Sequence, residues 1–250
     1  MATDRTTGHR AARVAIAACL ALAGMPVLAG DGDATGAGST AGKFLDLRAQ
    51  PPIHGDAAAG ASQAAVCNAC HGADGQGTAP MFPDLAGQSP TYLYVQLKAF
   101  HGGQRADPVM APLAAPLDDA AMRDLAAHYA TLPADPGVDP AADTPGHATG
   151  AALFHAGDPP RGIPPCQSCH GPAGIGPRVN AQVADPGRPG LPWATVPRLR
   201  GQSPAYVAKA LREFRDGERG RTSNAMIMQG VARSLTDADI QALADYLGTR

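Results

Sequence analysis

Two copies of the pattern Cys-x-x-Cys-His are the residues of this chain best suited to chemistry. The cysteines are Cys67, Cys70, Cys166 and Cys169, and the histidines are His71 and His170. In this spacing, two thiols can form thioethers with the vinyl groups of a haem, and the adjacent histidine is placed beneath the iron as its ligand. The pattern therefore predicts two covalently attached haem c groups, each with its iron.

Other uses of paired cysteines explain these motifs less well. In an oxidising compartment the four cysteines could instead form two disulfides. A zinc ribbon needs its two Cys-x-x-Cys pairs only about 15–20 residues apart, and here they are much farther apart. A thioredoxin-like dithiol would explain neither the duplication nor the histidine after each pair.

A longer repeat surrounds the motifs and indicates the elements that position them. The block from Pro83 to Tyr92 recurs from Pro197 to Tyr206 with the shared pattern P-x-L-x-G-Q-S-P-x-Y. Each block contains Ser-Pro near its end, which is typical of a helix start. Further helix starts are predicted near Asp118 and Thr236. We expect a mainly α protein, with an insertion in the second half over residues 171–196.

Composition and charge narrow the class of protein. The 250 residues include 30 Gly and 24 Pro but only 5 Phe, 5 Tyr and 1 Trp, and the formal net charge is −2. Few large apolar side chains with little net charge suggest an ordered protein whose core is partly not protein. We expect no nucleic-acid partner, because acidic residues outnumber basic ones and no basic run is present.

The N-terminus has the features of an export signal. Arg5, Arg10 and Arg13 precede an apolar stretch from Val14 to Ala29, so we expect residues 1–29 to be a cleaved signal peptide and the mature protein to be periplasmic. A lipoprotein box at Cys19 is disfavoured, because the apolar stretch before it is too short. No later apolar run approaches the roughly 20 residues of a spanning helix, so we expect no transmembrane segment in the mature chain.

The remaining chain divides by composition and repeat. Residues 30–54 are expected to form a flexible N-terminal extension, and residues 134–143, rich in Pro and Asp, are expected to be a linker. The two repeats then occupy residues 55–133 and 144–250.

Over roughly residues 56–250 the chain resembles the dihaem class I c-type cytochromes, specifically the cytochrome c4 family. The resemblance rests on the two Cys-x-x-Cys-His motifs, the two P-x-L-x-G-Q blocks, a Met before each final helix, and Gly60 and Gly150 in the first helices. It implies two tandem cytochrome c domains, each wrapped around a covalently bound haem. It also implies transfer of electrons between membrane complexes. The extension and the insertion containing Trp193 depart from the family.

In class I folds the loop before the final helix supplies a methionine as the second iron ligand, and its soft thioether raises the potential. Met110 precedes Leu117 by the same spacing as Met228 precedes Leu235, so these two are predicted to be the ligands. Met226 competes with Met228 but aligns with a proline. The remaining candidates are expected to be packing or surface residues; they are Met81, Met122, His54, His101, His128, His147 and His155.

The resemblance also implies residues around the ligands. The carbonyls of Pro83 and Pro197 are expected to accept a hydrogen bond from the haem-binding histidines, and Leu85 and Leu199 to pack on the haem faces.

Three functions are compatible with these motifs. The favoured one is a soluble carrier, not an enzyme, that shuttles electrons between respiratory partners, for example from a cytochrome bc complex to a terminal oxidase. The alternative is an electron-accepting subunit of a periplasmic dehydrogenase of the flavoprotein sulfide or thiosulfate oxidising type. A peroxidase-like dihaem enzyme is disfavoured, because it needs a five-coordinate haem and each iron here has a candidate Met.

Overall fold

The computed structural model describes residues 43–136, 146–177 and 193–248. The described chain is helical, with isolated bridges as its only β pairing, which confirms the expected mainly α fold. The predicted signal peptide and most of the predicted linker and insertion lie outside the described residues. Within those residues, no helix has the length and apolar character needed to span a membrane.

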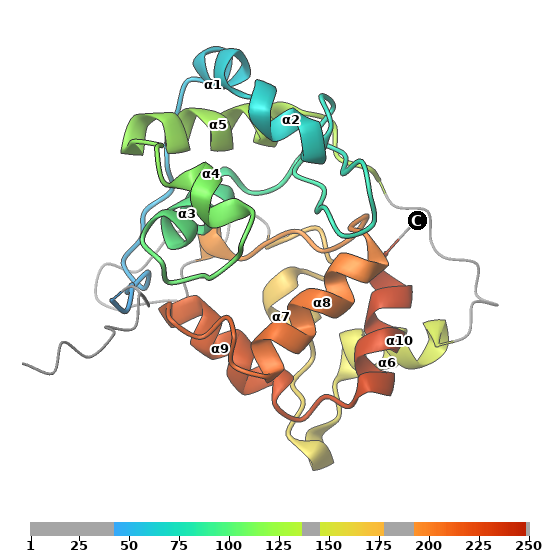
Figure 1. Cartoon of the computed structure of the whole chain (residues 1–250). Helices are drawn as coiled ribbons and strands as arrows, with labels where there is room; N and C mark the ends of the chain where they lie inside the picture. The colour runs from blue at the N-terminus through green and yellow to red at the C-terminus, as the bar shows by residue number, and fades with distance from the viewer. Residues whose placement is uncertain (1–42, 137–145, 178–192, 249–250) are drawn as a thin grey trace, which may run out of the picture. The chain divides into compact units, whose positions relative to one another are not determined.

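The first half is built from five helices of the described chain (Figure 1). They are α1 (Ala57–Gln63), α2 (Ala65–His71), α3 (Pro90–His101), α4 (Met110–Ala114) and α5 (Asp119–Thr131). α1 packs across α5, and α3 packs against α4 and α5. The Asp118 side chain caps α5 by accepting the Ala121 N–H at 2.8 Å, so the helix begins where the sequence predicts.

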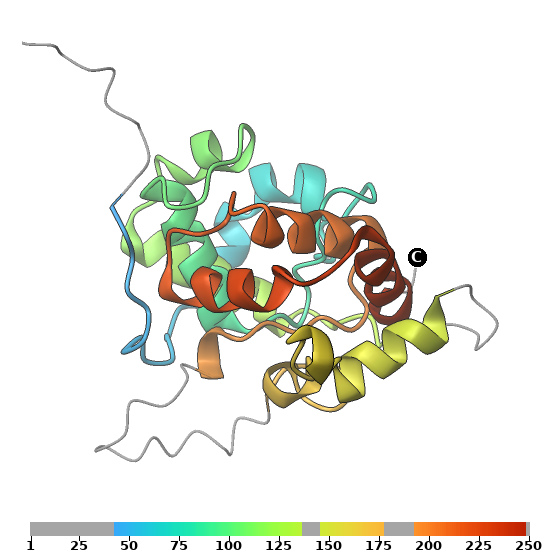
Figure 2. The ribbon, with the colours of Figure 1, turned by 90° about the horizontal axis from the view of Figure 1, so that it is seen from below.

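The second half repeats this arrangement. Its helices are α6 (His147–Ala156), α7 (Gln167–His170), α8 (Pro204–Arg215), α9 (Ser223–Ala232) and α10 (Asp237–Leu247), with short 3₁₀ turns η1 (Pro159–Arg161) and η3 (Trp193–Thr195). α6 packs on α10, as Figure 2 shows, and α8 packs on α9 and α10. Thr236 and Asp239 form the capping box that their spacing predicts.

Each half has its own apolar core. The first is centred on Tyr94, Val95 and Leu125, and the second on Phe154, Ile240 and Leu243. Apolar residues of the closing helices α5 and α10 are buried, including Met122 and Tyr129 in the first half.

The described part of the expected N-terminal extension is packed, which differs from our expectation of a flexible segment. Leu47 and Ile53 are buried in the first core, with 2% and 6% of their surface exposed. Leu45 also exchanges backbone hydrogen bonds with the second half, donating to Arg221 O and accepting from Ser223 N–H. The segment is held because its few apolar residues pair with positions far away in the sequence.

One predicted helix cap is also different in detail. Ser89 caps α3 by accepting the Tyr92 N–H, as expected. Its counterpart Ser203 makes no such bond. Both hydroxyls donate at 2.5 Å to a carbonyl of the other half, Ser89 to Ala194 O and Ser203 to Pro80 O.

Candidate functional site

A cavity of about 490 Å³ is lined by the Cys-x-x-Cys-His motifs of both repeats. Every residue predicted for the site lines it, although these residues come from distant parts of the chain. They are Cys67, Cys70, His71, Pro83, Leu85, Met110, Cys166, Cys169, His170, Pro197, Leu199 and Met228. Its remaining lining is largely aliphatic and aromatic, which suits a large planar apolar group.

Each motif histidine lies at the end of a helix and is fixed by a proline carbonyl. His71 closes α2 and His170 closes α7, and both are buried. Nδ1 of His71 is 2.9 Å from Pro83 O, and Nδ1 of His170 is 3.0 Å from Pro197 O. Burial lowers the pKa of both histidines, and the proline carbonyls act in the opposite direction. A neutral imidazole that donates through Nδ1 presents Nε2 for binding iron.

The motif cysteines are free thiols, so the structure does not pair them as the two disulfides considered above. Burial raises the pKa of Cys67, and it raises the pKa of Cys166 to about 11. Their position beside a histidine in an apolar cavity suits thioether attachment.

Leu85 and Leu199 are held against the cavity by equivalent backbone contacts. Leu85 N–H donates 2.7 Å to Gly75 O, and Leu199 N–H donates 2.7 Å to Gly174 O. Both acceptor glycines have positive φ, which brings these carbonyls round to the leucine. The same turn therefore shapes the cavity wall in each half.

The two predicted methionine ligands sit on helices, whereas we expected an extended loop. Met110 begins α4, where its N–H donates 2.8 Å to Asp107 Oδ1, and Met228 lies within α9. On a helix, residues two apart point about 200° away from each other. Met226 accordingly is 53% exposed and does not line the cavity, whereas Met228 is half-buried and does.

The other ligand candidates are placed elsewhere or are exposed. Met122 is buried in the first core, and Met81 lines the cavity edge with 48% of its surface exposed. Among the histidines of the described chain, only His71 and His170 line the cavity. His155, for example, bonds to Tyr246 Oη at 2.7 Å.

Two buried arginines at the cavity were missed by the sequence reasoning. Arg105 and Arg219 are 8% and 5% exposed, and both donate to Gln96 Oε1, at 2.8 and 3.0 Å. Each guanidinium lies over a phenylalanine ring, Phe100 for Arg105 and Phe214 for Arg219. A usable signal was present, because the Gly-x-Arg after each Phe is part of the repeat.

These arginines give the cavity a positive wall. Glu213 is the carboxylate that pairs with both, at 3.8 Å from Arg105 and 3.7 Å from Arg219. Burial by itself would raise the pKa of Tyr206, but the two arginines outweigh it and lower that pKa to about 8. Two buried guanidiniums facing one carboxylate leave positive charge that favours an anionic ligand group. The propionates of a haem are such groups, so the cavity fits haem in shape, donors and charge.

Comparison with known proteins agrees with this geometry. The cytochrome c family model matches residues 57–133 and 147–250. Cytochrome c4 of Pseudomonas aeruginosa is 40% identical, with 77% of this chain and 88% of that protein covered. A thiosulfate dehydrogenase electron acceptor of Stutzerimonas stutzeri is 37% identical, covering 75% of this chain and 80% of that protein.

A solved structure adds the fold. The crystal structure of reduced recombinant cytochrome c4 from Pseudomonas stutzeri superposes with a TM-score of 0.67 at 37% identity, covering 78% of this chain and 98% of that chain. The chain thus belongs to the cytochrome c family, as a dihaem electron-transfer protein of the cytochrome c4 type with two covalently bound haem c groups.

Proposed function

We propose that each half binds its haem through the same set of residues. Cys67 and Cys70 attach the first haem and His71 and Met110 bind its iron; the second haem is held by Cys166, Cys169, His170 and Met228. The observation that carries this assignment is the gathering of both complete sets around one apolar cavity. We assign the two haem domains to residues 55–133 and 144–250.

When bound, the haem iron accepts and gives up one electron, and the protein sets how readily it does so. The proline carbonyls fix the imidazole rings, and Leu85 and Leu199 keep water from the iron. Arg105 and Arg219 offset the charge of the propionates. Two protein ligands on each iron leave no position for a substrate, which supports a carrier rather than an enzyme.

The partners follow from this chemistry. We infer that the protein works in the periplasm, delivered there by the signal peptide, and carries electrons between membrane respiratory complexes. The similarity to a thiosulfate dehydrogenase electron acceptor favours one second candidate, in which the donor is a periplasmic dehydrogenase. Recording haem reduction by periplasmic extract, with and without thiosulfate, separates the two. Reduction that requires thiosulfate would favour the dehydrogenase partner.

The ligand assignment is tested by replacing each methionine of α9 in the oxidised holoprotein. Met228→Ala should abolish half of the weak red absorption band that arises from Met–ferric haem ligation, and should lower one of the two potentials. Met226→Ala is the matched control, because its side chain lies two residues away on the exposed face. Loss of the band in the Met226 variant but not in the Met228 variant would contradict the assignment.

A further inference from the structure

The glutamine that ends each P-x-L-x-G-Q pattern reaches into the opposite half of the protein. Gln88 belongs to the first repeat and Gln202 to the second, and both are buried, with 6% and 8% of their surface exposed. Burial of an amide is tolerated only when its polar atoms are hydrogen-bonded. The hydrogen-bond partners of these two amides therefore indicate what the glutamines do.

Each glutamine makes two hydrogen bonds to a single backbone residue across the interface. Gln202 Oε1 accepts the Asp84 N–H at 2.8 Å, and its Nε2 donates to Asp84 O at 3.0 Å. Reciprocally, Gln88 Oε1 accepts the Arg198 N–H at 2.7 Å, and its Nε2 donates to Arg198 O at 2.9 Å. The two contacts are equivalent under the repeat, so they form one symmetric pair.

The two residues held in this way are Asp84 and Arg198. Each directly follows a proline whose carbonyl accepts a hydrogen bond from a motif histidine. The C=O of Pro83 and the N–H of Asp84 belong to one planar peptide group. Its oxygen accepts from His71 Nδ1 at 2.9 Å, while its N–H donates to Gln202. The same chain runs from His170 through the peptide of Pro197 and Arg198 to Gln88.

We propose that Gln88 and Gln202 are positioning residues that each tune the haem of the opposite half. Hydrogen bonds in a chain polarise one another, so a bond to the peptide N–H makes its carbonyl a stronger acceptor. A stronger acceptor at Nδ1 makes the imidazole a more basic ligand, which favours ferric iron. Each glutamine thus lowers the potential of the haem bound in the other half. This inference rests on the proposed roles of His71 and His170 as iron ligands.

The test replaces Gln202 by leucine in the full dihaem protein; leucine adds no thioether that could bind iron. The two potentials are measured separately by following haem methyl NMR signals, assigned through contacts to residues of each half, during a redox titration. We expect the potential of the haem bound by His71 to rise and the hyperfine-shifted signals of the His71 ring to move. The haem bound by His170 should stay near its native potential.

The matched control is Ser203→Ala. Ser203 is the next residue and also bonds across the interface, but to Pro80 O, which is not part of the His71 peptide. It should leave both potentials unchanged. Gln88→Leu provides an independent second variant, for which the potential of the haem bound by His170 should rise.

Three results would overturn the inference. They are unchanged potentials in both glutamine variants, a shift confined to the haem of the substituted half, and a shift of the same size in Ser203→Ala. The wild-type spectrum keeps this outcome separate from the proposed function. If the red Met–haem band is present in the native protein but Gln202→Leu has no effect, the ligand assignment stands and only the tuning role fails.

Discussion

Replacing Gly150 by alanine should strongly destabilise the second haem domain. Gly150 lies in α6 where this helix meets α10, and a Cβ placed on it would lie 2.0 Å from Ala242 O and 2.7 Å from Tyr246 Cβ. Backbone atoms cannot rotate away as a flexible side chain can, so the two helices must separate. Overpacking of a core costs about 1–3 kcal/mol, and contact with backbone places this substitution at or above the upper end.

The expected size can be measured against a glycine that has room. Gly230 lies within α9, and a Cβ there meets nothing within 4 Å. Alanine is favoured over glycine inside a helix by about 1 kcal/mol, so Gly230→Ala should stabilise the protein slightly. For a domain of this size, a loss of 3 kcal/mol lowers Tm by roughly 12–24 °C.

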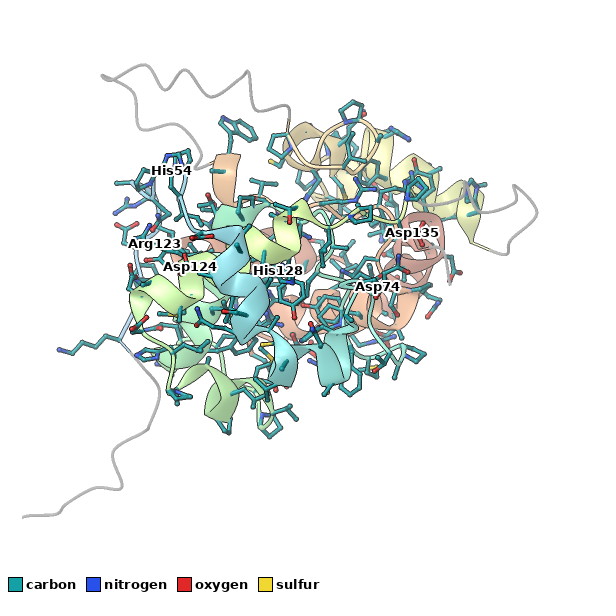
Figure 3. The ribbon with its side chains drawn as sticks, turned by 90° about the horizontal axis from the view of Figure 1, so that it is seen from above. His54, Asp74, Arg123, Asp124, His128 and Asp135 are labelled. Atoms are coloured by element: carbon teal, nitrogen blue, oxygen red, sulfur yellow. The ribbon has the colours of Figure 1, made fainter. Side chains whose placement is uncertain are left out.

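The assay is guanidinium and thermal unfolding of the oxidised holoprotein, followed by circular dichroism and by the red Met–haem band. We expect the two substitutions to shift the unfolding midpoint in opposite directions. Gly60→Ala should repeat the loss in the first half, since its Cβ would lie 2.0 Å from Asp124 O and 2.9 Å from His128 Cβ; Figure 3 labels both residues on α5. If Gly150→Ala were as stable as the native protein, the close helix crossing would not be what requires glycine.

Two further predictions concern charge. The hydrogen bond from Arg161 lowers the pKa of Asp239 to about 2; burial acts against this shift, and Thr236 adds to it. The Arg161–Asp239 pair therefore stabilises the fold at pH values above the unfolded pKa of about 3.9. This stability is lost as the pH falls towards 2. Urea unfolding of Asp239→Asn should show a loss of about 1–2 kcal/mol in the free energy of unfolding at pH 7, and this loss should shrink below pH 4. Asp237→Asn, at an exposed position, should have a smaller effect. A pH profile of stability in Asp239→Asn that matches the native protein would refute this. Separately, Arg198→Gln should lower the potential of the second haem, because Arg198 lines the cavity and a nearby positive charge favours ferrous iron. Arg200→Gln is the control, since the side chain of Arg200 is not at the cavity. An equal lowering of the potential in both variants would contradict the prediction.

The repeat explains how much of the site was predictable from the sequence. The same number of residues separates Met110 from Met228 and Asp124 from Ala242, so one register aligns both the ligands and the closing helices. That register favoured Met228 over Met226 as the ligand, and Met228 is the one of the two that lines the cavity. It gave no information on backbone conformation, and α9 was therefore expected to be a loop.

Other features depended on contacts between distant segments. Leu47 is one apolar residue in a short segment, and nothing local indicates that it packs in the first core. The glutamines were recognised as repeated, but their partners lie in the opposite half, which a pattern within one half cannot reveal. Arg105 and Arg219 were predictable in principle, since they occupy equivalent positions, but a charged residue in a loop is ordinarily a surface residue.

Repeated residues and unrepeated residues have different roles in the two sites. On the proposed assignment, repeated residues supply what both haems need alike: attachment, iron ligands, the proline carbonyl, and the glutamine that joins each carbonyl to the other half. The position after that proline is not repeated, with Asp84 in the first half and Arg198 in the second, and both line the cavity. Asp84 and Arg198 occupy equivalent positions in the repeat but carry opposite charges. They should therefore make the potentials of two otherwise similar haems unequal. A carrier with unequal sites favours one location for the first electron. With the proposed role of Gln88 and Gln202, whose side chains bond to the backbone of the opposite half, the potential of each site also depends on the other half.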